Sequence, residues 1–298
     1  MTIHSSSQAA RNDTQEMLMQ KSTIEVLPVP GARLHTETRG SGPLLVCIVG
    51  GNGDAEVFSQ IAAPLAARFT VVTYDRRGFA RSPVDSAVND AARLAADVDD
   101  AARVIEHHGG RPAHVFGSSS GAIVGLALLA REPRRVRTLV AHEPPLVTLV
   151  PDAAHWIALF DRVHATYLAR GVAEAMAEFC AGVGLEGLGL RDTPPAVQLP
   201  PHIAGMLARL PANQAFWLQH ELRHYPRFVP DTDALRAAAG QLILAVGAEP
   251  PNGPLARPAQ ALAASLQVPV VEFVGGHVGY ATNPGEFAPQ LERLLAAR

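Results

Sequence analysis

The chain has 298 residues and a formal net charge of −3, a length that fits one large domain with an insertion. Apolar residues make up 48% and charged residues 18%, which excludes a disordered or collagen-like chain. Lys21 is the single lysine and the arginines form no dense basic run, so the composition argues against nucleic-acid binding.

The termini and cysteines bear on localisation. Residues 1–22 are expected to form a flexible tail, because they lack the apolar core of a signal peptide. Cys47 and Cys180 offer neither a CxxC pair nor a disulfide framework, which suits a reducing compartment. Since no uninterrupted run of 18 apolar residues occurs, we expect a cytoplasmic protein without membrane or nucleic-acid partners. A homodimer is compatible with the sequence.

The first predicted elements form a hairpin, Thr23–Val29 and Ala32–Arg39, around the Pro30-Gly31 turn. The next strand, Leu44–Val49, is continuously apolar, as a strand covered on both faces must be. Further buried strands are expected at Phe69–Tyr74, Ala113–Phe116, Val136–Ala141, Leu242–Val246 and Val268–Phe273. Helices are expected between and after these strands, at Val57–Ala67, Ala91–His108, Gly121–Arg131, Pro254–Ser265 and Pro284–Ala297.

This alternation predicts an α/β fold with a mostly parallel central sheet and helices on both faces. The rhythm is interrupted over residues 147–232, where no buried strand is expected. Three helical stretches occur there instead, at Ala153–Ala169, Val172–Val183 and Ile203–His224. We therefore expect a helical lid inserted into a core formed by residues 23–146 and 233–298.

A candidate nucleophile stands where the strand at Ala113–Phe116 meets the following helix. Residues 117–121 read Gly-Ser-Ser-Ser-Gly, a G-x-S-x-G pattern centred on Ser119. Glycines allow close backbone approach in a tight strand-to-helix turn, and the helix N-terminus favours developing negative charge. Five residues fit a simple packing turn equally well, so the interpretation depends on their context.

Two further segments supply that context. Gly50-Gly51-Asn52-Gly53 follows the strand that begins at Leu44, and Asp75-Arg76-Arg77-Gly78 follows the next strand. In this order with the elbow, they resemble the α/β-hydrolase superfamily over about Thr23–Arg298, apart from the lid. The resemblance implies the α/β-hydrolase fold, and it implies that Asp75, Arg76 and Arg77 brace their turn.

A serine nucleophile needs a base, and the base must be oriented by a third group. His277 lies in the glycine-rich loop Val274–Tyr280 after the last predicted strand, where the superfamily carries its catalytic histidine. His142 is interpreted as structural, because neighbouring side chains of a strand point to opposite faces.

Two glutamates are candidates for the acid. Glu143 and Glu249 each follow a predicted strand, after Val136–Ala141 and Leu242–Val246 respectively. Most of the superfamily carries the acid three residues past a glycine, where this chain has Pro250. A branch of the superfamily instead places a Glu 24 residues past the nucleophile, which is Glu143 here. This resemblance favours Glu143, and Glu249 stays the alternative.

The resemblance also indicates an oxyanion hole formed by the backbone N–H groups of Asn52 and Ser120. Gly50-Gly51 replaces the superfamily's usual His-Gly pair, so the loop lacks that histidine side chain. A lid that covers the elbow would leave a mostly apolar substrate site. The substrate-binding candidates are the lid aromatic residues Trp156, Phe160, Phe179 and Trp217.

The sequence thus predicts a serine hydrolase without cofactor or metal, with a Ser-His-Glu triad, that cleaves an ester or lactone of a small to medium apolar substrate. The resemblance links dehalogenation and epoxide opening to an Asp at the elbow, so Ser119 disfavours both. Carbon–carbon bond hydrolysis, thioester cleavage and perhydrolysis stay open. A ligand receptor, and a cofactor-free oxygenase or cyclase with His277 as base, are the alternatives from other classes.

Overall fold

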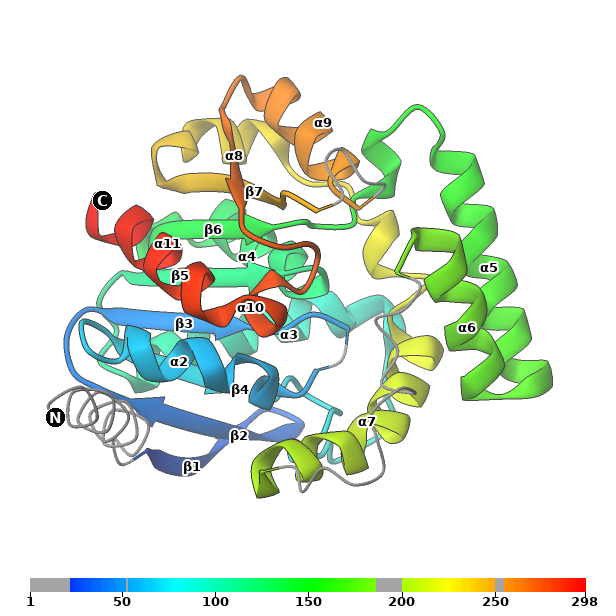
Figure 1. Ribbon diagram of the computed structural model, residues 1–298, viewed down its shortest axis with the longest axis horizontal. Coiled ribbons are helices and arrows are strands. Elements are labelled where there is room, and N and C mark those ends of the chain that lie inside the picture. Colours follow the sequence, from blue (N-terminus) through cyan, green and yellow to red (C-terminus); the bar gives the residue numbers. More distant parts are fainter. Residues whose placement is uncertain (1–21, 52, 186–199, 250–254) are drawn as a thin grey trace, which may run out of the picture.

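The computed structural model describes residues 22–51, 53–185, 200–249 and 255–298. Within these residues the centre of the fold is an eight-stranded sheet of order β1-β2-β4-β3-β5-β6-β7-β8 (Figure 1). The strands are β1 Thr23–Val29, β2 Ala32–Arg39, β3 Leu44–Ile48, β4 Thr70–Tyr74, β5 Ala113–Ser118, β6 Val136–His142, β7 Leu242–Gly247 and β8 Val270–Phe273.

The strand directions confirm the mostly parallel sheet. β1 and β2 form the predicted antiparallel hairpin, and β2 is also antiparallel to β4. From β4 through β3 to β8, all neighbouring strands are parallel. Every residue of β3, β5 and β7 is buried, which is why these strands are apolar or small in sequence except for His114 in β5.

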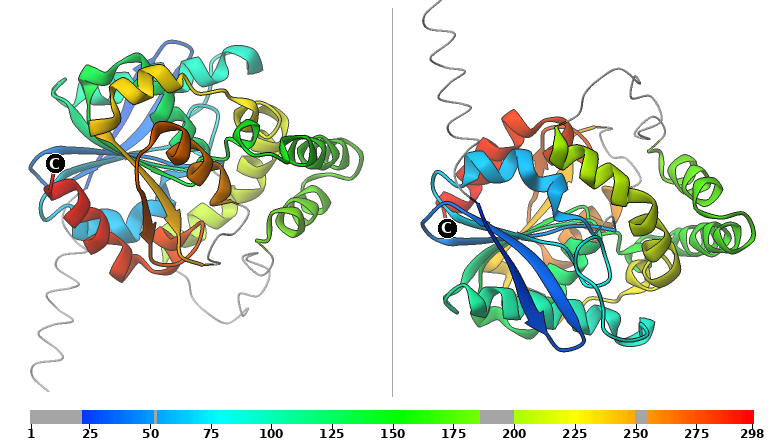
Figure 2. Two further views of the ribbon diagram at one scale, coloured as in Figure 1. Left: turned by 90° about the horizontal axis from the view of Figure 1, so that it is seen from above. Right: turned by 90° about the horizontal axis from the view of Figure 1, so that it is seen from below.

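Helices cover both faces of the sheet (Figure 2). One face carries α2 (Ser59–Leu65) and α11 (Pro284–Ala296), and Phe287 of α11 shares an apolar cluster there with Phe58 and Phe273. The helices packed on the other face are α3 (Asp90–His107), α4 (Ser120–Arg131), α8 (Thr232–Ala237) and α9 (Arg257–Leu266).

Helix ends show where local sequence signals were incomplete. The helix expected at Val57–Ala67 is divided into a 3-10 turn, Ala55–Phe58, and α2. The turn begins before Val57 because the Asp54 carboxylate caps it at the Glu56 N–H. Short α10 (Gly279–Thr282) was not expected. The expected start at Pro254 lies outside the described residues, and α9 begins at Arg257.

Three helices lie beyond the carboxyl ends of the parallel strands: α5 (Ala153–Arg170), α6 (Val172–Val183) and α7 (Pro201–His220) (Figure 1). We call them the lid helices. Their shared apolar cluster includes Trp156, Val163 and Leu218. The stretch expected to continue to His224 leaves the α-helix after His220, and Tyr225–Arg227 forms a 3-10 turn. None of the described helices is both long and apolar enough to span a membrane.

Sheet topology determines where the site forms. β3 has β4 on one side and β5 on the other, so the strand order reverses there. Ligands of open parallel sheets bind in the crevice beyond the carboxyl ends at such a reversal. Gly50 follows β3 and Ser119 follows β5, and a Cβ on Gly50 would lie 2.9 Å from Ser119 Cβ. The fold thus brings the glycine run and the elbow together.

Candidate active site

Ser119 occupies the tight turn between β5 and α4. Its backbone has φ 54° and ψ −123°, a region that non-glycine residues rarely adopt. The Ser119 N–H donates to the His142 carbonyl at 2.9 Å, which holds the turn against β6. A Cβ on Gly117 would lie 2.5 Å from Gly121 O, so the turn can close only around small residues. Ser119 directly follows the end of β5, and its side chain is partly exposed there.

Ser120 and Asn52 were the expected oxyanion donors. Ser120 is the first residue of α4, and an N–H at that position has no carbonyl one turn earlier to receive it. This amide is therefore suited to an anion at the helix N-terminus. Asn52 lies outside the described residues. Beside it, the Gly53 N–H donates to the Gly50 carbonyl at 3.0 Å.

Glu143 follows β6 and is held from three directions. It has φ 47°, and its N–H donates to the Ala245 carbonyl at 2.9 Å. Its Oε1 accepts the Gly247 N–H at 2.9 Å, and its Oε2 lies 2.6 Å from His277 Nδ1. Burial alone would raise the Glu143 pKa, but the bonds to His277 and Gly247 outweigh it and hold the pKa below its usual value. The carboxylate therefore stays ionised at neutral pH.

His277 lies in the loop between β8 and α10. The Gly275 carbonyl accepts the Glu249 N–H at 2.9 Å, and a Cβ on Gly247 would lie only 2.7 Å from Gly276. The end of β7 therefore braces this loop. An ionised carboxylate accepts but cannot donate, so Nδ1 of His277 carries the proton toward Glu143. In a neutral ring with this tautomer, Nε2 is the acceptor.

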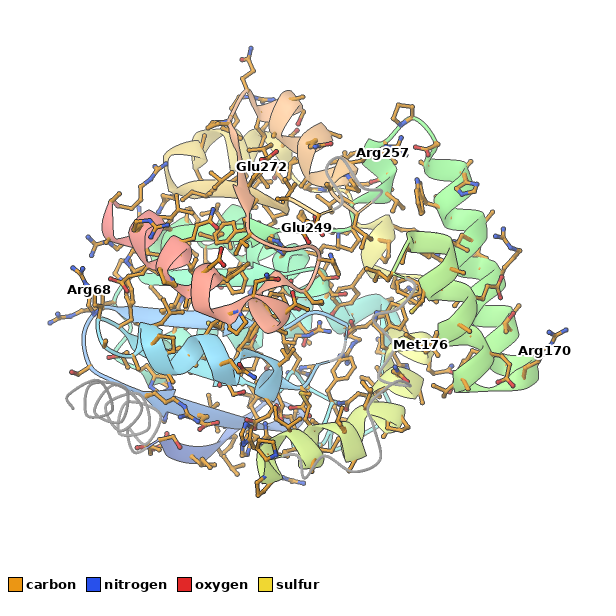
Figure 3. The ribbon with its side chains drawn as sticks, viewed as in Figure 1. Arg68, Arg170, Met176, Glu249, Arg257 and Glu272 are labelled. Atoms are coloured by element: carbon orange, nitrogen blue, oxygen red, sulfur yellow. The ribbon has the colours of Figure 1, made fainter. Side chains whose placement is uncertain are left out.

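The two candidate acids differ in position. Glu143 is buried and hydrogen-bonded to His277, whereas Glu249 is exposed in the loop after β7 (Figure 3). Glu249 contributes to the His277 loop through its backbone, a role that the sequence did not indicate. The structure thus brings Glu143 to His277 by its carboxylate.

His142 points into an aromatic cluster formed by Phe116, Phe273, Tyr280 and Phe287. The ring is fully buried, and neither ring nitrogen has a hydrogen-bond partner among the described residues. Burial lowers the His142 pKa to about 4, so the ring is neutral near pH 7. This surrounding fits the structural interpretation.

The four lid aromatics occupy different environments. Trp217 covers the glycine run, since a Cβ on Gly51 would lie 2.4 Å from Trp217 Nε1. Its ring also meets the Phe179 ring edge-on, with the ring centroids 4.8 Å apart. Trp156 and Phe160 are buried within the lid, where they border an apolar cavity of about 20 Å³. Of the four, Trp217 is thus placed against the glycine run at Gly51.

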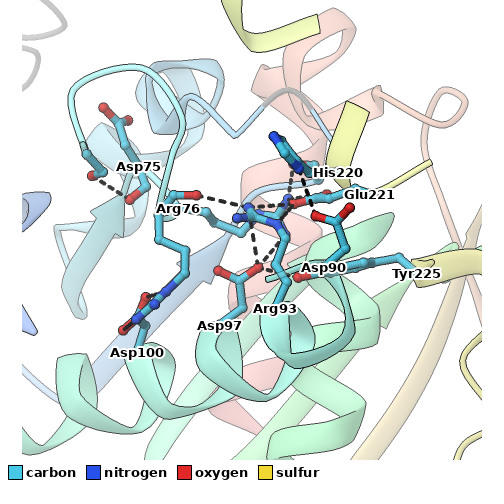
Figure 4. Close-up of polar contacts among 12 residues, drawn as sticks. Asp75, Arg76, Asp90, Arg93, Asp97, Asp100, His220, Glu221 and Tyr225 are labelled. Carbon is cyan, nitrogen blue, oxygen red and sulfur yellow. Dashed lines mark hydrogen bonds and ion pairs between the residues drawn. The ribbon is translucent and has the colours of Figure 1, made fainter. Parts of the chain in front are cut away.

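A buried ionic cluster was missing from the sequence interpretation (Figure 4). Arg76 was expected to brace its turn, and it bonds to Asp97 on α3 and to Glu221, the residue after α7. One signal could have indicated Glu221. It follows Trp217 by four residues and therefore continues the face of α7 that packs on the core.

Comparisons with known proteins agree with this fold. Residues 43–173 match the family model described as alpha/beta hydrolase fold. The chain is 33% identical over 280 residues to the uncharacterized hydrolase YraK of Bacillus subtilis, covering 90% of this chain and 94% of that protein. It is 32% identical over 133 residues to zearalenone hydrolase of Cladophialophora bantiana, covering 43% of this chain and 49% of that one.

Among solved structures, carboxylesterase CesB of Bacillus subtilis superposes with a TM-score of 0.66 at 19% identity, covering 98% of this chain and 97% of that one. At this identity the similarity concerns the fold. The family model and the full-length similarity to YraK go further. The chain belongs to the alpha/beta hydrolase fold family, and it is a hydrolase.

Proposed function

We propose that the protein is a cofactor-independent serine hydrolase that cleaves a carboxylic ester or lactone of a small to medium apolar substrate. Ser119 is the nucleophile, His277 the base and Glu143 the residue that orients His277. The observation that carries the proposal is the 2.6 Å contact between Glu143 Oε2 and His277 Nδ1. Glu143 follows β6, the neighbour of the strand β5 that leads into the Ser119 elbow. The named activity of zearalenone hydrolase is compatible with it.

The chemistry follows from these positions. Nε2 of His277 takes the Ser119 proton as Oγ attacks the substrate carbonyl, and the Glu143 carboxylate stabilises the resulting imidazolium. The N–H groups of Ser120 and Asn52 would stabilise the oxyanion. Collapse of the tetrahedral intermediate breaks the C–O bond, and the imidazolium protonates the leaving alkoxide. In a lactone this alkoxide stays attached to the acyl group.

Water then hydrolyses the acyl-enzyme. His277 removes a proton from the water as it attacks the ester carbonyl, and it returns this proton to Ser119 Oγ when the acid is released. The apolar lid side chains around Trp217 and Phe179 support an apolar acyl or alcohol group on the substrate. Neither partial reaction requires a metal or an organic cofactor.

The proposal is tested by covalent labelling with a fluorophosphonate. We expect intact-mass and peptide analysis to show one adduct on Ser119 of the wild-type protein. Ser119→Ala should give no adduct and no turnover of p-nitrophenyl esters or lactones while keeping its fold. Ser118→Ala is the matched control, because this neighbouring hydroxyl is buried, and it should still be labelled. If the folded wild-type protein is not labelled and cleaves neither the p-nitrophenyl esters nor the lactones, the proposal is refuted in favour of a receptor or an oxygenase.

A further inference from the structure

Four charged side chains are buried together between α3, the turn after β4 and the end of α7 (Figure 4). Arg76, Arg93, Asp97 and Glu221 are each at most 2% exposed. Arg76 Nη2 lies 2.6 Å from both carboxylate oxygens of Glu221, and Arg76 Nη1 lies 3.0 Å from Asp97. Arg93 Nη2 donates to Glu221 at 2.8 Å. Two guanidinium groups and two carboxyl groups therefore share a site with almost no solvent exposure.

Stability alone is a weak reason for such a cluster. Removing two charges from water costs about as much as their attraction returns, and apolar replacements of buried ion pairs are often no less stable. The burial raises the Glu221 pKa, against the opposing effect of Arg76 and Arg93. The cluster also holds backbone groups of the active-site region in place.

Arg76 also binds the glycine run at two points. Its Nη2 donates to the Gly50 carbonyl at 3.3 Å, and its backbone N–H donates to the Gly53 carbonyl at 3.1 Å. Gly50 in turn borders the nucleophile, since a Cβ there would lie 3.5 Å from Ser119 Oγ. We call Gly50, Gly51 and Gly53, the described residues of the glycine run, the oxyanion loop. A continuous set of contacts thus leads from Glu221 through Arg76 to the loop beside Ser119.

We propose that Glu221 is a positioning residue for the oxyanion loop: it fixes the Arg76 guanidinium, which in turn fixes the Gly50 carbonyl. This inference rests on the proposed hydrolase function, because it assigns the loop a role in stabilising the transition state. Arg76, which Glu221 binds, belongs to the core, whereas Glu221 itself follows the lid helix α7. The position of this lid helix therefore determines how well the loop is held for catalysis.

Other contacts attach α7 to the core without Arg76. The Ala80 N–H donates to the Asn213 side chain at 2.8 Å, and His220 Nδ1 lies 2.7 Å from Asp90. A Cβ on Gly78 would lie 2.0 Å from the Phe216 ring, so that ring packs directly on the turn. Because these contacts remain, loss of the Glu221 charge should leave the lid in place and loosen the loop.

The test compares Glu221→Gln with His220→Gln. Glutamine keeps the shape of Glu221 but leaves Asp97 as the only negative partner of Arg76 and Arg93 within this cluster of four side chains. We expect Glu221→Gln to lower kcat about 10- to 100-fold, less than or similar to the loss of a whole oxyanion donor, with KM changed less than about threefold. The Ki of a boronic acid that forms a tetrahedral adduct with Ser119 should rise in the same proportion. His220→Gln, which removes a neighbouring lid contact, should change none of these.

A second readout does not depend on turnover. Hydrogen exchange of the Gly53 amide, followed by NMR, should become faster in Glu221→Gln and stay unchanged in His220→Gln. If the wild-type protein proves not to use Ser119, the proposed function fails, whereas unchanged Gly53 exchange in Glu221→Gln would refute the positioning contact itself. Equal kcat losses in the two variants would mean that Glu221 only anchors the lid.

Arg76→Lys keeps the test decisive if Glu221→Gln does not fold. Lysine retains the positive charge beside Glu221 and Asp97 but has no second nitrogen for the Gly50 carbonyl. We expect kcat to fall with little change in KM, and hydrogen exchange of the Gly53 amide to become faster, as in Glu221→Gln. A folded Arg76→Lys variant with wild-type kcat and wild-type exchange would overturn the proposal.

Discussion

Ser119 and Glu143 share an uncommon backbone conformation. Both have positive φ, 54° and 47°, although neither is a glycine. Such a conformation costs on the order of 1–3 kcal/mol and persists only where the surroundings impose it. Each residue directly follows a buried strand and donates its N–H to the adjoining strand, to His142 O and Ala245 O respectively. These bonds support the strained backbone and direct both side chains to the crevice.

The variants Glu143→Gln and Glu249→Gln test which of the two glutamates orients His277. Glutamine at position 143 keeps the size of the side chain but cannot stabilise the imidazolium, so kcat should fall by about three to four orders of magnitude. Glu249→Gln should keep at least half of kcat, because the Glu249 backbone bond to Gly275 does not depend on its side chain. Steady-state kinetics of both variants and the double variant are the measurement. A severe loss in Glu249→Gln with normal Glu143→Gln would reverse the assignment.

His142 predicts a defined acid sensitivity. Its folded-state pKa of about 4 is below the ordinary value of 6.5, so the unfolded chain takes up the proton first as pH falls. Stability from this group is complete above pH 6.5 and is lost progressively down to pH 4. His142→Phe should therefore reduce the drop in unfolding free energy between pH 7 and pH 5 by about 2 kcal/mol.

Urea unfolding at the two pH values measures this difference. Phenylalanine suits the surrounding rings, and no hydrogen bond of the His142 ring is lost among the described residues. An unchanged pH dependence in the variant would contradict a buried neutral His142.

At the scale of elements, α4 packs unusually close to β3. A Cβ on Gly121 would lie 2.1 Å from the Ile48 carbonyl oxygen, a backbone atom that cannot turn aside. This approach brings the helix N-terminus next to the end of β3, and it thereby places Ser119 and Ser120 beside the oxyanion loop. The glycine of the elbow pattern is thus needed for the contact between two elements.

Gly121→Ala should lower the free energy of unfolding by at least about 2 kcal/mol, because either helix or strand must move. Gly285→Ala is the matched control, since Gly285 also lies in the first turn of a helix and a Cβ there meets nothing within 4 Å. The free energy of unfolding of Gly285→Ala should rise by up to about 1 kcal/mol, because alanine has a better helix propensity than glycine. Equal denaturation midpoints for the two variants would show that α4 is not so constrained.

At the scale of the whole molecule, the sheet core and the lid helices meet through charged as well as apolar contacts. Arg76 and Glu221 join the turn after β4 to the end of α7, and Arg209 of α7 binds the buried Asp54 at 2.8 Å. Asp152, just before α5, pairs with Arg257 at the start of α9. Contacts at both ends of the lid therefore favour cooperative unfolding of lid and core.

Cys47 can report that cooperativity. It lies in β3 at 0% exposure, and burial raises its thiol pKa to about 12, so it should not react in the native protein. In a Cys180→Ser background, labelling of Cys47 by a disulfide reagent should require global unfolding, and its rate should rise with urea as global unfolding does. Rapid labelling at low urea, independent of denaturant, would instead reveal local opening of the central sheet.

Much of the fold was predictable because its signals are local. Continuous apolar runs indicated the buried strands, and the Pro30-Gly31 turn indicated the hairpin with the bounds that the structure has. Ser119 and His277 stood out as site candidates for a related reason, since each lies in a short glycine-rich pattern directly after a strand. The lid aromatics were less informative, because apolar spacing on a helix does not distinguish lid core from substrate contact.

What only the tertiary structure decided involves residues distant in sequence. Glu143 and Glu249 both follow β-strands, and no local pattern tells which carboxylate meets an imidazole on a third strand end; the neighbouring positions of β6, β7 and β8 decide it. Glu221 similarly reaches Arg76 across 145 positions. A contact of this kind depends on how α7 packs on the core, so the sequence determined the elements and their glycine turns, while packing between elements determined the partners of these charged groups.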